Sequence, residues 1–220
     1  MPKAPLNYAT APPLGREFYD RDPREVGRDL LGKVLVRRNR RELLAGRIVE
    51  TEAYLGENDP AAHAAAGRTA RNYVLFGPPG HAYVYFIYGN HWCLNVSTLP
   101  DGIAGGVLFR ALEPLAGQAA MARARGLNAG AIEGRRIRLL TSGPGRMAEA
   151  FGVTRARDND RDMTDPDSDL VIVDDGYRPE SIAETPRIGV TKAAEHALRY
   201  VIPGNPFVSG KAIKLTPLHP

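Results

Sequence analysis

The sequence predicts an α+β fold, a single domain built on a mainly antiparallel β-sheet with helices around it. Its strand-like segments follow one another largely as hairpins instead of alternating with helices, an order that favours antiparallel pairing. The length of 220 residues, with 43% hydrophobic and 25% charged residues, suits one globular domain. No repeat or convincing linker divides the chain. We therefore expect an irregular arm over residues 1–15 and one domain over residues 16–220.

A helix opens the domain. Asp22 is a typical capping residue, Pro23 suits the first helical position, and Glu25 follows three residues after the cap. Gly32 should end this helix, because glycine is the usual residue just beyond a helix C-terminus.

Strands and a long loop come next. Residues 33–38 predict a strand, and a turn near Asn39 leads into a second strand that reaches Tyr54. Residues 56–80 contain many Gly, Pro and Ala and predict a loop with one short helix. The remaining expected elements are a hairpin over residues 81–98, strands over 106–112, 170–173 and 187–190, and helices over 117–125 and 145–151.

The hairpin carries several aromatic side chains. Its tight turn places Tyr88 at or beside the tip, where the ring cannot fill the core of its own sheet. A protein-interface anchor and a wedge inserted into a base stack both fit such a residue. A two-residue loop would put Asn95 on the opposite face from Tyr85. A three-residue loop would pair Tyr83 with Asn95 and line one surface with both tyrosines and the asparagine.

A carboxylate, Glu52, lies in the apolar strand that ends at Tyr54. Strand alternation puts Glu50, Glu52 and Tyr54 on one face. Burying a carboxylate is costly unless it has a partner or a task. Arg110, at the end of a Val-Leu-Phe strand, is the natural partner. Two interpretations stay open at this point: a structural ion pair with Arg110, and a general base beside a stacking site.

Other motifs exclude several kinds of chemistry. His63 is a lone histidine in a loop, with no second histidine at zinc spacing, and Cys93 is the single cysteine, so we expect neither a metal site nor a disulfide. The chain has no phosphate-binding Gly-Lys-Ser/Thr loop and no serine nucleophile elbow. No apolar run approaches membrane-span length, and the N-terminus has no secretory signal. We expect no cofactor, no membrane and a reducing cytoplasm or nucleoid.

Charge is unevenly distributed although the net charge is only +4. Residues 118–157 hold 8 basic against 2 acidic residues, and residues 158–185 hold 10 acidic against 2 basic ones. Basic clusters at residues 37–41 and 135–138 fit a surface that tracks phosphates. An ordinary solvated face fits them at least as well. We expect the acidic segment to face solvent, away from any polyanion.

Several motifs spread along the chain point to one family. They are residues 49–56, 61–63, 71–72, 83–89, 93–96, 108–114, 142–144 and 187–190. In this order they resemble the alkyladenine (3-methyladenine, methylpurine) DNA glycosylases, and the resemblance runs from about Phe18 to Ser209. It implies a curved, open-barrel-like sheet with a protruding hairpin. The implied activity is hydrolysis of the N-glycosidic bond of alkylated or deaminated purines in double-stranded DNA, leaving an abasic site.

The resemblance also assigns roles to individual residues. Glu52 matches the base that activates water, and Arg110 and the Ile188 backbone carbonyl match groups that hold this water. Tyr54, His63 and Tyr85 match residues that stack on the flipped purine. Asn95 matches the residue that crowds out the amino group of normal guanine, and Tyr88 matches the side chain that fills the gap in the duplex. No lysine lies between Lys33 and Lys192, so we expect no lyase step. We expect a monomer from a prokaryote that acts on 3-methyladenine, 7-methylguanine, hypoxanthine and ethenoadenine. The alternative is a non-catalytic nucleic-acid-binding module.

Overall fold

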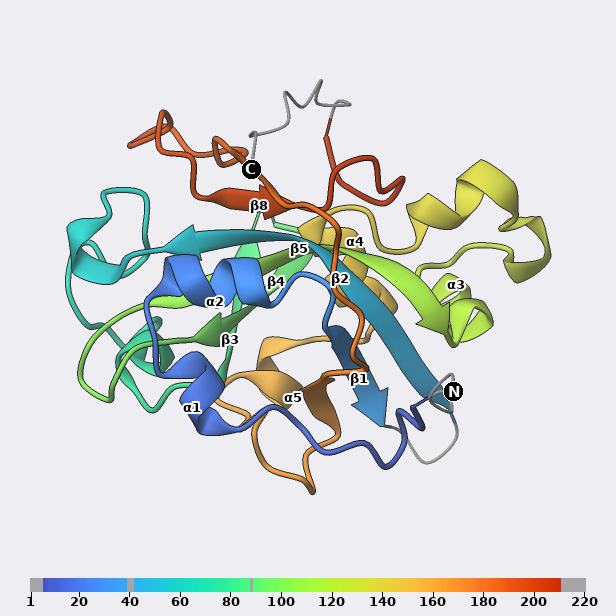
Figure 1. Cartoon of the computed structure of the whole chain (residues 1–220), viewed down its shortest axis with the longest axis horizontal. Coiled ribbons are helices and arrows are strands. Elements are labelled where there is room, and N and C mark those ends of the chain that lie inside the picture. Colours follow the sequence, from blue (N-terminus) through green and yellow to red (C-terminus); the bar gives the residue numbers. More distant parts are fainter. Residues whose placement is uncertain (1–5, 39–41, 88, 211–220) are drawn as a thin grey trace.

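The computed structural model describes residues 6–38, 42–87 and 89–210, and within them it shows one antiparallel sheet (Figure 1). Its strands are β1 (Val34–Arg38), β2 (Leu43–Tyr54), β3 (Ala82–Ile87), β4 (His91–Ser97), β5 (Gly106–Ala116), β6 (Leu170–Val173), β7 (Ala183–Thr185) and β8 (Arg199–Val201). The main strand order is β3-β4-β5-β2-β1-β6, with β8 beside β2 and β7 beside β8. The sheet does not close. The predicted α+β class is confirmed.

Strand β2 organises this sheet because it is long enough to pair with three others. It pairs with β5 along most of one edge. On its other edge, residues 43–47 pair with β1 and residues 50–52 pair with β8. One edge of β2 is therefore shared between β1 and β8, and the end of β2 that pairs with β8 carries the candidate base Glu52.

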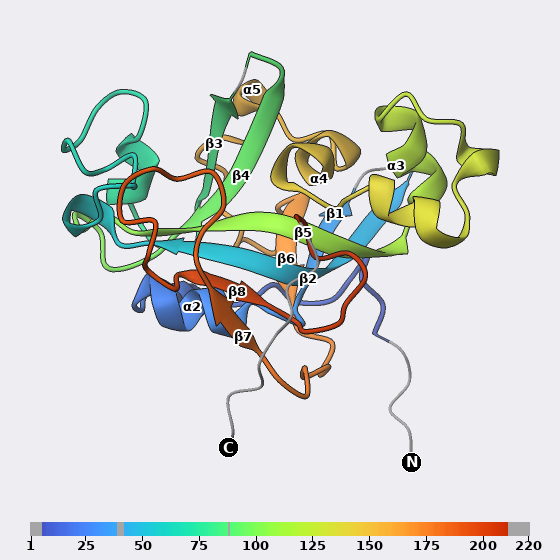
Figure 2. The ribbon, with the colours of Figure 1, turned by 90° about the horizontal axis from the view of Figure 1, so that it is seen from above.

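Helices cover both sides of the β2/β5 layer (Figure 2). They are α1 (Arg16–Tyr19), α2 (Pro23–Asp29), α3 (Gln118–Ala124), α4 (Pro144–Ala150) and α5 (Arg155–Asp158), together with the 3₁₀ helices η1 (Gly56–Asn58), η2 (Tyr73–Phe76), η3 (Ala129–Ala131) and η4 (Gly134–Leu139). In Figure 2, α2 lies on one side of this layer, whereas α3, α4 and the raised β3/β4 hairpin lie on the other. No helix in the described part of the chain is long and apolar enough to cross a bilayer.

Most expected elements are present close to their predicted bounds. The Asp22 side chain accepts a hydrogen bond from the Arg24 N–H at 2.8 Å, with Pro23 at the start of α2. Gly32, just after this helix, has φ +89°, a conformation that favours glycine. The long loop over residues 56–80 holds the short helices η1 and η2. The turn predicted near Asn39 lies outside the described residues, and the division into an arm (1–15) and a domain (16–220) remains a proposal.

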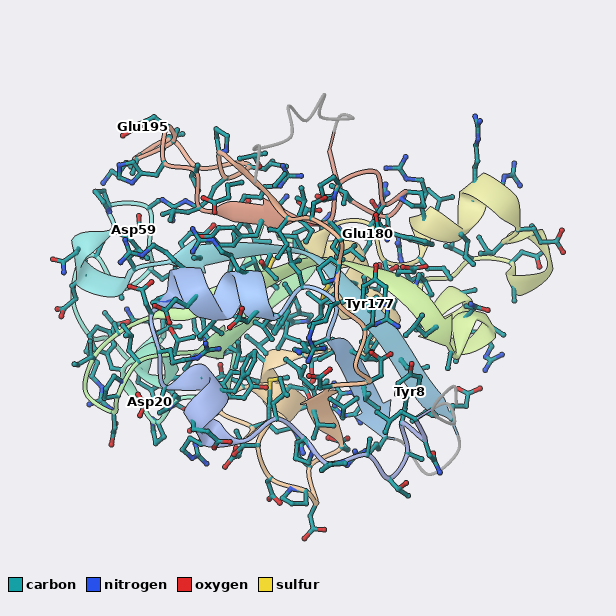
Figure 3. The ribbon with its side chains drawn as sticks, viewed as in Figure 1. Tyr8, Asp20, Asp59, Tyr177, Glu180 and Glu195 are labelled. Carbon is teal, nitrogen blue, oxygen red and sulfur yellow. The ribbon has the colours of Figure 1, made fainter. Side chains whose placement is uncertain are left out.

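The strand predicted over residues 187–190 is wrong. This segment is a loop, in which Gly189 has φ +80° and the Arg187 side chain is buried and pairs with Asp59. Asp59 is labelled in Figure 3. The strands of this region are β7 before the loop and β8 after it. We did not predict β8, because its first residue is the charged Arg199, which is buried only because a carboxylate far away in sequence pairs with it.

Two apolar clusters support the fold and the site. The larger one includes Tyr19, Ile48 and Phe109 and packs on both faces of the β2/β5 layer, against α2 on one side and against α3 and α4 on the other. The smaller one includes Leu75 and Leu108 and packs against the inward face of the β3/β4 hairpin. Because the smaller cluster is also the apolar floor of the cavity described below, packing of the hairpin fixes the shape of that cavity.

Candidate active site

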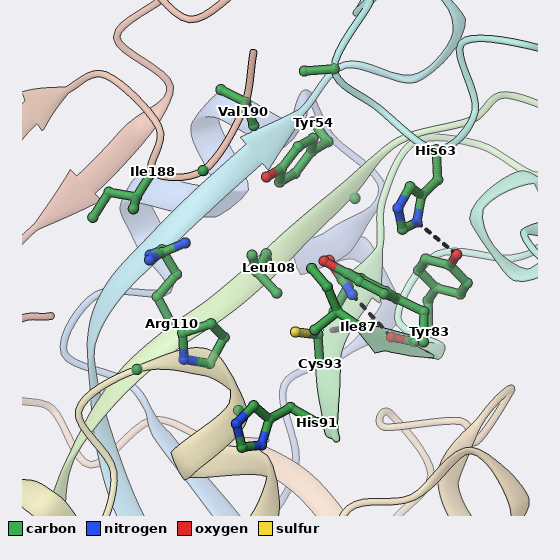
Figure 4. A pocket seen from close by; sticks show the side chains of 18 of the residues that line it. Tyr54, His63, Tyr83, Ile87, His91, Cys93, Leu108, Arg110, Ile188 and Val190 are labelled. Carbon is green, nitrogen blue, oxygen red and sulfur yellow. Dashed lines mark hydrogen bonds between the residues drawn. The ribbon is translucent and has the colours of Figure 1, made fainter. Parts of the chain in front are cut away.

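A cavity of about 590 Å³ opens between the β3/β4 hairpin, the ends of β2 and β5, the start of α4 and the loop that follows β7 (Figure 4). This volume falls in the range of sites for small molecules. Its lining is largely aromatic and apolar, with a few polar groups. Tyr54, His63, Tyr85, Asn95, Arg110 and Ile188, all predicted as site residues, line this one cavity.

The hairpin supplies one wall, and its register settles the question of loop length. Tyr83 pairs with Asn95, and the last pair of the ladder is Ile87 with His91, which leaves three residues between the strands. The tyrosines and Asn95 therefore share the cavity face, as the three-residue alternative predicted. Tyr88, the predicted wedge, lies outside the described residues.

The aromatic side chains of this wall contact one another. The rings of His63 and Tyr85 pack edge to face with centroids 4.4 Å apart, and His63 Nδ1 lies 2.9 Å from the Tyr83 hydroxyl. Burial, with the charge of Arg71, lowers the pKa of His63, which keeps the imidazole neutral. Tyr54 extends into the cavity from the end of β2, apart from the hairpin wall (Figure 4). The side chains available for stacking are therefore uncharged.

Two further residues fix this wall and were not predicted to do so. The Asn72 side-chain amide, almost fully buried, donates to the His63 carbonyl at 2.8 Å and holds the loop that carries the imidazole. Asn72 belongs to one of the family-like motifs, but its partner could not be read from the sequence. On the hairpin, the Asn95 amide donates to the Tyr83 carbonyl at 3.1 Å, so the side chain of Asn95 is held against the backbone.

Glu52 has no exposed surface and lies directly behind the cavity lining. Its Oε1 atom accepts a hydrogen bond from the Ile188 N–H at 2.8 Å and lies 3.1 Å from Arg110 Nη1. Its Oε2 atom accepts a hydrogen bond from the Tyr54 hydroxyl at 3.0 Å. All three partners line the cavity. A carboxylate oxygen can accept two hydrogen bonds, so Oε2 keeps one position that no group among the described residues fills.

The electrostatics of Glu52 suit a base. Burial raises the pKa of Glu52 above the ordinary glutamate value, and Arg110, the Ile188 N–H and the Tyr54 hydroxyl offset this rise only in part. A carboxylate with a raised pKa is a stronger proton acceptor than an ordinary glutamate. By contrast, burial raises the pKa of the Cys93 thiol to about 11, so Cys93 does not supply a thiolate nucleophile at neutral pH.

Irregular pairing between β2 and β5 sets the direction of the Arg110 side chain. Ile48 pairs with Leu112 and Glu50 with Ala111, but the next pair is Thr51 with Phe109. Val49 on β2 and Arg110 on β5 are therefore extra residues, as in β-bulges, which commonly redirect side chains beside active sites. The Arg110 guanidinium bridges two carboxylates, with Nε 2.9 Å from Glu50 Oε1 and Nη1 near Glu52. The predicted pairing of Arg110 with Glu52 is confirmed.

Glu50 is the centre of a second set of contacts that sequence reasoning missed. Its Oε1 atom accepts hydrogen bonds from Arg199 Nε at 2.6 Å and from the Ser209 hydroxyl at 2.9 Å, and its Oε2 atom accepts the Ser209 N–H at 2.6 Å. The sequence also did not indicate that the Arg187 side chain belongs to the site. It pairs with Asp59, with Nη2 2.9 Å from Oδ1, and its guanidinium lies 4.7 Å from the centre of the Tyr54 ring.

The expected charge surfaces require correction. Arg37, from the basic cluster at residues 37–41, is buried and pairs with Asp158, so it cannot track phosphates. The acidic segment does not simply face solvent, because several of its carboxylates pair with basic residues elsewhere in the chain. These pairs are Asp158 with Arg37, Asp162 with Arg16, Asp174 with Lys33, and Asp175 with Arg47. Arg135, Arg136 and Arg138 are exposed on η4, as a solvated face or a phosphate-tracking surface would require.

The site offers no evident metal ligands. Among residues 6–38, 42–87 and 89–210, no group of three or more His, Cys, Asp or Glu side chains gathers so that it could hold a metal ion.

Comparison with known proteins identifies the family. The family model described as methylpurine-DNA glycosylase (MPG) matches residues 17–206. A protein of Koribacter versatilis named "putative 3-methyladenine DNA glycosylase" is 64% identical over 211 residues, which cover 96% of this chain and 99% of its own. Proteins with the same name from Methanocella arvoryzae and Burkholderia lata are 50% identical over 188 residues and 46% identical over 198 residues. These matches cover 86% and 90% of this chain, and 90% and 91% of theirs.

The predicted resemblance is confirmed, since both the family model and these relatives span most of the chain. The chain belongs to the methylpurine-DNA glycosylase family and is a DNA-repair glycosylase, a hydrolase that acts on N-glycosyl bonds.

Proposed function

We propose that the protein excises alkylated purines from double-stranded DNA with a water molecule that Glu52 activates. The observation that carries this proposal is the position of the Glu52 carboxylate. It lies behind an aromatic cavity, held by Ile188, Arg110 and Tyr54, with one acceptor position of Oε2 unfilled by the described residues. A water bound there would lie beside the sugar of a base stacked in the cavity.

The proposed reaction balances with one water. Glu52 accepts a proton from the water, the water oxygen forms a bond to C1′ of the sugar, and the C1′–N9 bond breaks with its electron pair moving to the purine. A purine alkylated at N3 or N7 carries a positive charge and departs as a neutral base. The products are the free base and an abasic site, and Glu52 later releases its proton to solvent. General base catalysis of this kind contributes roughly 10²–10⁴-fold.

The cavity walls favour a flat, electron-poor ring. Flipping a base from a duplex costs a few kcal/mol, and least for a damaged base. Stacking on aromatic side chains contributes roughly 1–3 kcal/mol per base and offsets this cost. We assign the stacking to Tyr54, His63 and Tyr85. The low pKa of His63 supports this role, because a neutral imidazole does not repel a cationic purine.

We propose three further roles on the same basis. Asn95, held by its bond to the Tyr83 carbonyl, excludes the exocyclic amino group of normal guanine. The Ile188 carbonyl, next to the amide that binds Glu52, helps to hold the water. Tyr88 fills the gap in the duplex. We propose that hypoxanthine and ethenoadenine are substrates besides the methylated purines, and that the protein acts as a monomer in a prokaryotic nucleoid.

A direct test measures base release from duplexes that each carry one lesion. We expect wild-type protein to release free 3-methyladenine or 7-methylguanine and to leave an abasic site. Glu52→Gln should bind the same duplexes but release the base roughly 10²–10⁴-fold more slowly. The competing interpretation, a binding module without catalysis, predicts tight binding and no release by either protein. Undiminished release by Glu52→Gln would exclude Glu52 as the base.

A further inference from the structure

We infer that two pairs of cations hold the DNA backbone on opposite sides of the cavity mouth: Arg71 with Arg155, and Arg146 with Lys192. This inference rests on the proposed function, because it takes duplex DNA as the partner. It specifies which basic residues contact phosphates, a question that the sequence clusters answered wrongly for Arg37.

Several other arginines already form ion pairs with carboxylates. On the α1–α2 side of the molecule, Arg16, Arg21, Arg24 and Arg28 each pair with a carboxylate. The buried arginines of the site are paired as well, Arg110 with Glu50 and Glu52, and Arg187 with Asp59. A paired guanidinium contributes little net field at a distance, so these residues do not create a surface for a polyanion.

The cavity rim is different. No Asp or Glu is among the described residues that line the cavity, whereas Arg146 on α4 and Lys192 on the loop after β7 both line it and are exposed. Neither cation lies within 4.0 Å of a carboxylate in the described part of the chain. Arg146 donates a long hydrogen bond of 3.5 Å to the Ser142 carbonyl, which leaves most of its five N–H donors available.

A second pair lies by the aromatic wall. Arg71 is exposed, and the neighbouring Asn72 donates to the His63 carbonyl at 2.8 Å, so Arg71 lies beside the loop that carries the imidazole. Arg155 Nη2 donates to the Ala70 carbonyl at 3.4 Å, so it lies next to Arg71 in space. Neither arginine forms an ion pair within residues 6–38, 42–87 and 89–210. Asp160, an acid of the same region, is occupied by His81 Nδ1 at 3.0 Å.

Arg71 and Arg155 lie beside the segment that carries His63, whereas Arg146 and Lys192 line the cavity on α4 and on the loop after β7. Tyr83 and His63, next to the first pair, face Ile188 and Val190, which lead to Lys192 (Figure 4). A nucleotide flipped into the cavity has a phosphate on each side of its sugar, and the strand must continue in both directions from the mouth. Unpaired cations on two sides with no acid between them match that backbone. Phosphate contacts of this kind supply affinity and position without reading sequence.

The salt dependence of binding tests this inference. The probe is a duplex oligonucleotide with one hypoxanthine, bound by proteins in a Glu52→Gln background between about 50 and 200 mM salt. Each phosphate contact adds roughly 0.9 to the slope of log K against log salt concentration. We expect Arg71→Ala/Arg155→Ala and Arg146→Ala/Lys192→Ala each to reduce the slope by about 1.8. The matched control is Arg24→Ala/Arg178→Ala, which removes two exposed but ion-paired arginines and the same net charge.

The outcomes are distinct. A reduced slope in both rim variants, with a slope in the control close to that of the unchanged protein, supports the inference. Equal reductions in all three would mean that only overall charge matters and would overturn it, and so would a reduction in only one rim pair. Base release by the Glu52-containing protein is a separate measurement. A protein that releases base while the rim slopes stay unchanged refutes this inference alone, whereas a protein that releases none refutes the proposed function.

Discussion

Two clusters of buried charge in this molecule look alike but border different surroundings. The site cluster consists of Glu50, Glu52, Arg110 and Arg199. The structural cluster consists of Arg37, Asp158 and Asp169, between β1 and α5. In both, a carboxylate with no exposed surface faces a guanidinium at about hydrogen-bond distance, 3.1 Å for Glu52 and 2.8 Å for Asp158.

The difference lies in the space next to the two carboxylates. Asp158 accepts from Arg37 with one oxygen and from the Thr154 N–H with the other, inside packed protein. The partners of Glu52 line a cavity of about 590 Å³, and its pKa is raised because burial outweighs its donors. Burial and ion pairing therefore do not distinguish a catalytic carboxylate from a structural one. We propose that an adjoining cavity, from which a water could reach an unfilled acceptor position, does.

Substituting Glu52 by Gln removes the carboxylate of the site cluster and should give the largest change in activity, the roughly 10²–10⁴-fold loss of base release described above. Stability should not fall with it. Because the folded-state pKa of Glu52 is raised above its unfolded value, the wild-type protein loses stability as pH rises through that pKa. Urea unfolding should therefore find Glu52→Gln at least as stable as wild type at pH 7, with a smaller advantage at lower pH. Strong destabilisation at pH 7 would show that the charge is structural.

Substituting Asp158 by Asn removes the buried carboxylate of the structural cluster and should lower the stability of the fold. Removing the buried carboxylate leaves Arg37 with only the partly exposed Asp169 as a countercharge and costs about 3–5 kcal/mol of unfolding free energy. Urea unfolding measures this loss. At a temperature where Asp158→Asn is still folded, its rate of base release should stay within about twofold of wild type, because no site residue contacts Asp158. A loss of release without a loss of stability would reverse the roles of the two clusters.

A smaller effect is expected at Asn95, which we propose filters the base and which forms no hydrogen bond to Glu52. Truncation to Ala removes the amide that is held against Tyr83 and opens space in the cavity wall. The preference for hypoxanthine over guanine should then fall about tenfold, the scale of one steric contact in a pocket. Single-turnover rates on duplexes with each base measure the preference, and release of 3-methyladenine, which has no 2-amino group, serves as the control. An unchanged preference would show that another group excludes the amino group.

The sequence predicted those parts of the site that local patterns determine. Strand alternation placed Glu52 on the same face as Tyr54, and Arg110 was named as its natural partner. The two possible loop lengths already included the observed hairpin register. Contacts between distant segments could not be predicted in this way. Arg199 and Ser209 reach Glu50 across 149 and 159 residues of chain, and neither lies in a recognisable pattern.

The prediction of charged surfaces from the sequence was wrong for the same reason. A basic cluster in the sequence does not reveal which of its members meet carboxylates after folding. Arg37 lies in the densest cluster but is neutralised by Asp158, whereas Arg146 is isolated in sequence and exposed at the cavity. Predicting a phosphate-binding surface therefore needs the ion pairs of the folded protein as well as the positions of the arginines.

The pH dependence of single-turnover release tests most directly whether Glu52 acts as the base. A duplex with 7-methylguanine is the suitable substrate, because the leaving base is already cationic and needs no protonation. The rate should rise with pH through one ionisation whose midpoint lies above about 4.3, the ordinary glutamate pKa, since burial raises the pKa of Glu52. Glu52→Gln should show a slow rate without this ionisation. The same rise with pH in Glu52→Gln, or a wild-type rate that does not change with pH, would contradict the assignment of Glu52 as the base.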